Sequence, residues 1–111
     1  MISLIKDSMY KLEILPIAKK DMDDIIYYIS NNLKNLSAAR DLAKSFMDGA
    51  NKILNFPYGL SIYNSILKLE NEYRSIKVKN FLMFYTIDEK NKTITIVRVL
   101  YNKMDINSIL N

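Results

Sequence analysis

The sequence predicts an α+β fold in which an N-terminal strand and a helical hairpin pack on a curved antiparallel sheet, followed by a short C-terminal helix. Three observations lead to this class. Apolar residues alternate with polar ones near the N-terminus, recur every three or four positions from residue 17 to 53, and gather in β-branched and aromatic runs after residue 72. The length of 111 residues favours one domain covering residues 1–111.

The N-terminal half is expected to hold one strand and two helices. The stretch "YKLEIL" at 10–15 alternates as a half-buried strand does, and Pro16 ends it. A helix follows from about Ile17 to Leu33, with an apolar face that includes Met22 and Ile25. Ser37 is the expected cap of a second helix, which "NFPYG" at 55–59 terminates. The short turn between the helices predicts a helical hairpin.

The C-terminal half is expected to form the sheet. Strands are predicted over 73–79, 81–87 and 93–100, with "DEKNK" at 88–92 as a turn. Short turns between successive strands imply antiparallel pairing. Residues 62–69 form either a further short strand or an irregular segment, and Asp105 is the expected N-cap of the final helix.

Composition narrows the chemistry. The chain has no Cys and no His, so disulfides, thiolate catalysis and the usual zinc ligands are absent, and no metal or cofactor is expected. The first residues, "MISLIKDSMYKLEIL", contain no unbroken apolar run. A signal peptide or membrane span is therefore not expected, and a cytoplasmic location is.

The net charge of +4 lies in one half of the chain. Residues 63–103 hold eight Lys and Arg against four acids, while the remaining residues are balanced. A one-sided field of this kind suits a polyanion or an acidic protein partner. A solvated basic surface without a dedicated partner is the ordinary alternative.

Three stretches together resemble the RelE/ParE superfamily of toxins. "AKKDMDDIIYYISNN" (18–32) is similar to the first helix of that family, and "YRSIKVKNFLMFYTID" (73–88) with "IVRVLYNKMD" (96–105) is similar to its C-terminal signature. The similarity runs from about Tyr10 to Leu110. It implies a small RelE-like fold and the toxin half of a bacterial type II toxin–antitoxin module, with a cognate antitoxin as partner.

The resemblance implies two alternative targets. RelE-like members cut mRNA in the ribosomal A site, whereas ParE-like members inhibit DNA gyrase. A third alternative is an inactive relative that only binds a partner. RNA cleavage by the 2′-OH needs a base, an acid and cations around the phosphate, and no metal. The candidate catalytic residues are Arg74, Arg98, Tyr101 and Lys103, and the candidate target-binding residues are Lys77, Lys79 and Tyr85.

Strand periodicity restricts how these residues combine. Arg74 is expected on the opposite face of its strand from Lys77 and Lys79, so they share one flat site only if a bulge intervenes. By the same alternation Arg98 is expected beside Ile94, Ile96 and Leu100, which makes an ion pair with an acid such as Glu70, Glu72 or Asp105 an alternative to catalysis.

Two departures from RelE-like sequences favour a gyrase inhibitor slightly. Leu82 stands where RelE-like enzymes often carry Arg, and Tyr101 stands where many have His. Several candidate residues also have ordinary structural alternatives. Tyr85 at the end of an apolar strand suits core packing, and edge lysines discourage aggregation of the sheet. Tyr27 and Tyr28 suit either a partner surface or cover for the sheet edge.

Overall fold

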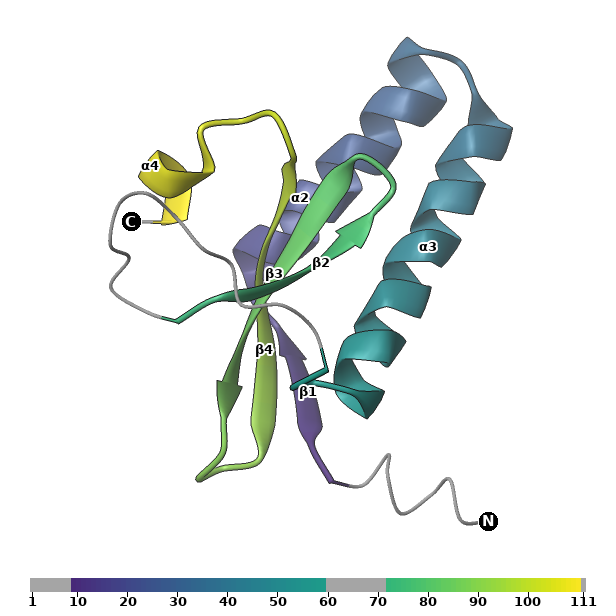
Figure 1. Cartoon of the computed structure of the whole chain (residues 1–111). Helices are drawn as coiled ribbons and strands as arrows, with labels where there is room; N and C mark the ends of the chain where they lie inside the picture. Colours follow the sequence, from purple (N-terminus) through teal and green to yellow (C-terminus); the bar gives the residue numbers. More distant parts are fainter. Residues whose placement is uncertain (1–8, 60–71, 111) are drawn as a thin grey trace, which may run out of the picture.

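The computed structural model describes residues 9–59 and 72–110. Its secondary structure follows the predicted order of a strand, two helices, three strands and a short helix (Figure 1). The elements are β1 (Lys11–Ile14), α2 (Pro16–Tyr27) with a π-helical turn at Tyr28–Asn32, α3 (Leu36–Asn55), β2 (Arg74–Val78), β3 (Phe81–Asp88), β4 (Thr93–Tyr101) and α4 (Ile106–Leu110). The α+β class is confirmed. The possible strand over 62–69 lies outside the described residues.

The described strands form one sheet in the order β1-β4-β3-β2. The pairs β2–β3 and β3–β4 are antiparallel, as the short turns predicted. β1 instead runs parallel to β4, with Lys11 opposite Thr93 and Ile14 opposite Ile96. The sheet is therefore mixed, a detail that the expectation of an antiparallel sheet did not include. Parallel neighbouring strands need a long connection, and here the stretch of chain that joins β1 to β4 includes both long helices.

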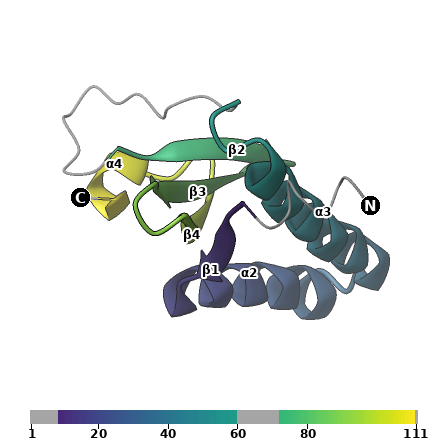
Figure 2. The same ribbon diagram turned by 90° about the horizontal axis from the view of Figure 1, so that it is seen from below.

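The main core lies between the sheet and the α2–α3 pair. Figures 1 and 2 show the two helices side by side along one side of the sheet, with α4 away from them. The apolar helix faces predicted from the sequence point inward, and they bury Ala18, Leu42, Phe46 and Ile53. Their partners in the strands are Val78, Met83, Tyr85, Ile94, Ile96 and Val99.

A second, smaller apolar cluster lies under α4. Tyr73, Phe84, Leu100 and Ile106 are its buried members, so this short helix is held by burial of its apolar side chains. Asp105 lies just before α4, where a cap was expected, and its Oδ2 accepts a hydrogen bond from Ser108 Oγ at 2.8 Å.

The ends of the long helices differ from the prediction. The α-helical part of α2 ends at Tyr27, and a π-helical turn replaces the predicted last turn. The cap of α3 is Asn35, whose Oδ1 accepts from the backbone N–H of Ala38 at 3.0 Å, so the expected cap Ser37 was wrong. Lys34, with φ 52°, turns the chain so that Asn35 takes this place.

Gly49 lets α3 approach β2 closely. A Cβ at this buried helical position would lie 2.9 Å from Cγ2 of Val78, which is shorter than carbon atoms tolerate. Glycine disfavours the helix at this position, but the absence of a side chain allows the helix to pack closely on the strand. None of the helices in residues 9–59 and 72–110 has the length and hydropathy to cross a bilayer.

Candidate functional site

A β-bulge decides where Arg98 points. Phe84 pairs with Arg98 while the next residue, Tyr85, pairs with Ile96, so Val97 is an extra residue in β4. An inserted residue reverses the alternation of side chains beyond it. Arg98 therefore shares a face with Phe84, whereas Ile96 belongs to the main core.

The expectation that Arg98 lies beside Ile94, Ile96 and Leu100 was accordingly wrong for the two isoleucines. Both are fully buried in the main core under the helices. Leu100 belongs to the cluster under α4, on the same side of the sheet as Phe84. The bulge was anticipated as a possibility for the first C-terminal strand, but the structure has it in the last.

Arg98 forms an ion pair with Asp21 of α2. Its Nε and Nη2 donate to the two carboxylate oxygens of Asp21 at 2.8 and 2.9 Å, and the backbone N–H of Val99 donates to Oδ2 at 3.0 Å. The expectation of Glu72 or Asp105 as the partner was therefore wrong, and the third expected partner, Glu70, lies outside the described residues. Hydrogen bonding to Asp21 raises the pKa of the Arg98 guanidinium. An ion pair with an acid was the expected alternative to a catalytic role for Arg98.

Asp21 also closes the edge of the sheet. β1 pairs with β4 only as far as Ile96, and the backbone N–H of Leu15 donates to the Ile96 carbonyl at 3.0 Å. Beyond that point α2 lies along β4, and the Asp21 carboxylate takes the N–H of Val99 that a neighbouring strand would otherwise accept. The Asp21 side chain therefore both accepts a hydrogen bond from the backbone at the edge of β4 and pairs with Arg98.

Arg74 lies at the start of β2 and packs on an aromatic ring. Its guanidinium carbon is 5.0 Å from the ring centroid of Tyr58, which follows α3 in the chain. The turn that carries Tyr58 is fixed to the core, because the buried Tyr85 donates from its Oη to the Pro57 carbonyl at 2.6 Å. Arg74 is therefore held in a defined place by a cation–π contact.

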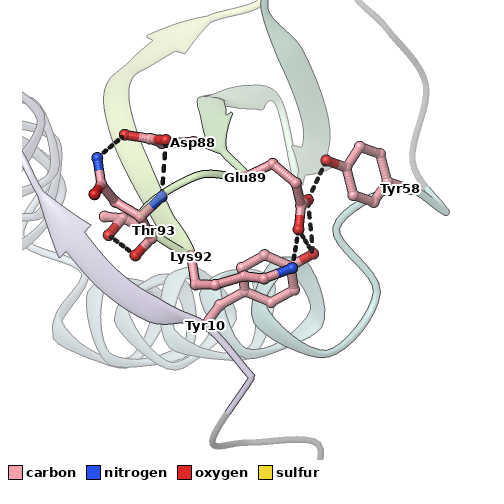
Figure 3. Close-up of polar contacts among 7 residues, drawn as sticks. Tyr10, Tyr58, Asp88, Glu89, Lys92 and Thr93 are labelled. Atoms are coloured by element: carbon pink, nitrogen blue, oxygen red, sulfur yellow. Dashed lines mark hydrogen bonds and ion pairs between the residues drawn. The ribbon is translucent and has the colours of Figure 1, made fainter.

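A carboxylate in the β3–β4 turn holds Tyr58. Glu89 accepts hydrogen bonds from Tyr58 Oη at 2.5 Å and from Tyr10 Oη at 3.0 Å, and it forms an ion pair with Lys92 (Figure 3). The Lys92 and Tyr58 hydrogen bonds lower the pKa of Glu89 to about 2. The same bond to Glu89 is the main reason that the pKa of Tyr58 is raised to about 12.

The Glu89 cluster was missed by sequence reasoning. Its members come from three places in the chain: the residue before β1, the turn after α3 and the β3–β4 turn, as Figure 3 shows. "DEKNK" predicted a turn, and Asp88 indeed accepts from the Asn91 backbone N–H at 3.1 Å. Nothing in the local pattern indicated that Glu89 would collect two distant tyrosines.

One open groove of about 720 Å³ brings Arg74 and Arg98 together. Side chains from β2, β3, β4, α4, the start of α2 and the turn after α3 line it. The members that bear on chemistry are Tyr58, Glu72, Tyr73, Arg74 and Arg98. Two of the four candidate catalytic residues therefore share a surface, and an acid and two phenols lie beside them.

The other candidate residues lie elsewhere. Lys77 and Lys79 line a separate groove between β2 and α3. Tyr101, about two-fifths exposed, lines a third and largely apolar pocket together with Tyr28 and Phe81. Lys103 is exposed in the turn after β4. The structure thus divides the predicted catalytic set between different surfaces.

Tyr85 is a core residue. It is fully buried, its hydroxyl is bound to the Pro57 carbonyl, and burial raises its pKa to about 12. This leaves no exposed part of Tyr85 for a target to contact, and the packing alternative describes it. Among residues 9–59 and 72–110, no group of three or more His, Cys, Asp or Glu side chains is placed to hold a metal ion.

Solved structures of toxin–antitoxin systems share this fold. A chain of the chromosomal ParDE system from P. aeruginosa superposes with a TM-score of 0.67 at 16% identity, over 84% of this chain and 96% of that one. The archaeal RelE–RelB complex from Pyrococcus horikoshii OT3 gives 0.58 at 11% identity, over 86% and 97%. The RelBE2 complex from Mycobacterium tuberculosis gives 0.51 at 18%, over 83% and 96%. At these identities the likeness establishes the RelE-like fold.

The comparison with curated proteins gave no match. A family profile, described as the ParE toxin of the parDE type II toxin–antitoxin system, matches residues 12–106, which is nearly the whole chain. The match takes in both arginines of the groove, the bulge in β4 and the Asp21 that pairs across it. The chain therefore belongs to the ParE toxin family of type II toxin–antitoxin systems.

Proposed function

We propose that this toxin acts by binding DNA gyrase and blocking it, that it cuts no RNA, and that a cognate antitoxin neutralises it in the cytoplasm. Membership of the ParE family supports gyrase as the target, since gyrase inhibition is what the ParE branch implies. The P. aeruginosa relative is part of a ParDE system, which supports an antitoxin partner here.

The observation that carries the non-nuclease part is the pairing of Arg98 with Asp21. Cleavage of RNA needs cations free to stabilise a crowded, doubly charged phosphorane. The Nε and Nη2 donors of Arg98 are already bound to a carboxylate, so its charge is largely neutralised by Asp21. Breaking this pair to bind phosphate would leave Asp21 uncompensated against the strand edge.

The candidate proton-transfer groups also argue against RNA cleavage. A general acid or base works best when its pKa lies near the operating pH. Tyr58, whose ring packs against Arg74, has a pKa raised to about 12, mainly by its hydrogen bond to Glu89, and keeps its proton. Tyr101 and Lys103, which were the candidates for this role, do not line the groove that contains the two arginines.

Two parallel assays test the proposal. Purified toxin is added to bacterial DNA gyrase with relaxed plasmid, and separately to a translating extract in which mRNA 5′ ends are mapped. We expect loss of supercoiling and no new mRNA ends. Codon-dependent mRNA ends with normal supercoiling would overturn the proposal, and no effect in either assay would favour an inactive relative that only binds a partner.

A matched pair of variants separates the two mechanisms further. Tyr101→Phe removes the hydroxyl of the candidate acid or base, and it is expected to leave gyrase inhibition and mRNA unchanged. Tyr27→Phe, at an exposed tyrosine outside the pocket of Tyr101, is the control for loss of one phenolic hydroxyl. A selective loss of mRNA cleavage with Tyr101→Phe would return this residue to a nuclease mechanism.

A further inference from the structure

The sheet has two outer edges, and β1 forms the edge opposite β2. β1 is the first strand in the sheet order, so no described strand pairs with its outer side. Most of its residues are exposed, and the extended backbone continues through Leu15, with φ −64° and ψ 146°. An unpaired strand edge of this kind is a template on which a further strand adds.

Backbone groups of β1 point alternately toward β4 and toward the open edge. Lys11 and Leu15 donate their N–H groups to carbonyls at and just before β4, at 2.8 and 3.0 Å. Odd-numbered residues of this stretch therefore face β4. The intervening residues, Tyr10, Leu12 and Ile14, direct their N–H and C=O groups outward, to the side on which no described strand lies.

The side chains of β1 form two sets that alternate in the same way. Tyr10 and Leu12 pack against the main core under the helices. Lys11 and Glu13 lie on the other face and are exposed. Neither forms an ion pair within residues 9–59 and 72–110. The open edge therefore carries one cation and one anion, two residues apart, each available to a charge on another molecule.

This spacing of charges is self-complementary. When a second copy of β1 adds antiparallel, its outward backbone groups must face those of the first, and the core-facing side chains of both copies must stay on one side. A register centred on Lys11 sets two lysines opposite each other, and one centred on Glu13 sets two glutamates. The register centred on Leu12 instead sets Lys11 of each copy opposite Glu13 of the other. Opposite charges in such positions stabilise a pair of strands.

The same register also matches the apolar side chains. Tyr10 would come opposite Ile14, and Met9 opposite Leu15. Met9, Ile14 and Leu15 are 50%, 43% and 39% exposed in the single chain, so the pairing removes apolar surface from water. Backbone hydrogen bonds would form at Tyr10, Leu12 and Ile14. The charged pairs would occupy the intervening positions, where facing side chains lie closest.

The edge of β2 has no such complementarity. Arg74 and Lys77 are the charged residues of β2, and Lys79 follows it in the chain. All three are cations, so no register between two copies sets an acid opposite a base there, and like charges that face each other destabilise the pair. Charge therefore favours β1 over β2 as the edge that a second copy uses.

We propose that two copies of this chain pair through β1, antiparallel about a two-fold axis at Leu12, so that their four-stranded sheets become one continuous sheet. The axis is perpendicular to the sheet, so the helices of both copies cover the same face. The paired edge is short, and a weak dimer with a Kd of about 10–100 µM is expected. At the lower concentrations of thermal melts the chain is then a monomer. The inference does not depend on gyrase as the target.

Sedimentation velocity of the full chain, from about 5 to 500 µM, measures the dimer. Lys11→Glu and Glu13→Lys each set like charges opposite each other at both charged positions, and each is expected to weaken the dimer at least about tenfold. Lys90→Glu, in the exposed β3–β4 turn, changes the net charge as Lys11→Glu does, and it should change the Kd less than about twofold. Circular dichroism verifies that each variant is folded.

Combining the two reversals tests the register. The double variant Lys11→Glu/Glu13→Lys restores both opposite pairs, and its Kd should return to within about threefold of the wild type. An equimolar mixture of the two single variants should form a heterodimer of similar Kd, because each lysine then faces a glutamate of the other copy. A double variant that stays monomeric, or a mixture that does not associate, would overturn the proposal.

Amide hydrogen exchange locates the contact. We expect the protection of the Leu12 and Ile14 amides to increase with protein concentration, because these N–H groups bond only in the dimer. A chain that is monomeric at about 500 µM, or a dimer that Glu13→Lys leaves unchanged, would overturn the proposal. So would a monomer in which both amides are protected at every concentration, since residues 1–8 of the same chain would then occupy this edge.

Discussion

Replacing Gly49 by alanine tests the close approach of α3 to β2. The added Cβ would lie 2.9 Å from Val78 Cγ2, and Met83 atoms would follow at 3.8 and 3.9 Å. Non-bonded carbon atoms rest at about 3.5–4.0 Å, so the Val78 contact is too short by about 0.6 Å or more. Val78 is 5% exposed and β-branched, which leaves it little freedom to turn away.

Two effects of opposite sign determine the result. Alanine is better than glycine in a helix interior by about 1 kcal/mol, which favours the variant. Overpacking a filled core costs about 1–3 kcal/mol, which opposes it. We therefore expect the free energy of unfolding of Gly49→Ala to fall by about 0–2 kcal/mol, rather than to rise by about 1 kcal/mol as at an uncrowded helical site.

A double-mutant cycle measured by urea unfolding isolates the contact. Val78→Ala removes the atom that the new Cβ would meet, so in that background Gly49→Ala should increase the free energy of unfolding by about 1 kcal/mol. The change of sign between the two backgrounds is the expected result. A stabilisation of about 1 kcal/mol in both backgrounds would refute the steric reasoning, because only helix propensity would then be at work.

Three further changes test the polar contacts. Tyr85→Phe leaves the Pro57 carbonyl without its buried donor and should lower the free energy of unfolding in urea by about 1–2 kcal/mol; no change would mean that water replaces the hydroxyl. Asp21→Ala removes three hydrogen bonds and should cost about 2–3 kcal/mol in the same assay, with Asp21→Asn intermediate, and a cost below that of Tyr85→Phe would contradict the edge-closing role. The contribution of Glu89 should be present above pH 4.5 and be lost as the pH falls toward 2, because its pKa is lower in the folded chain. Thermal melts of Glu89→Gln should show a weaker acid dependence in that range than the wild type, whereas the exposed control Glu13→Gln should match the wild type.

The site was harder to predict than the elements because its contacts are not local. Arg98 and Asp21 are 77 residues apart in the chain, so no spacing rule connects them. Arg74 is steadied by Tyr58, and Tyr58 by Glu89, and each of these contacts joins different elements. Sequence reasoning identified Arg74 and Arg98 as residues of interest but not what they contact.

The sequence by itself determined the kinds of element, their order, the apolar faces of both long helices and the basic character of the C-terminal half. These properties depend on periodicity, turn residues and composition, which are local and survive any packing arrangement. Only the tertiary structure decided which charged side chains share a surface. A single inserted residue at Val97 reverses the faces of β4, and parallel pairing of β1 stops where α2 takes over the strand edge. Both depend on contacts between segments far apart in the chain, where local pattern carries no information.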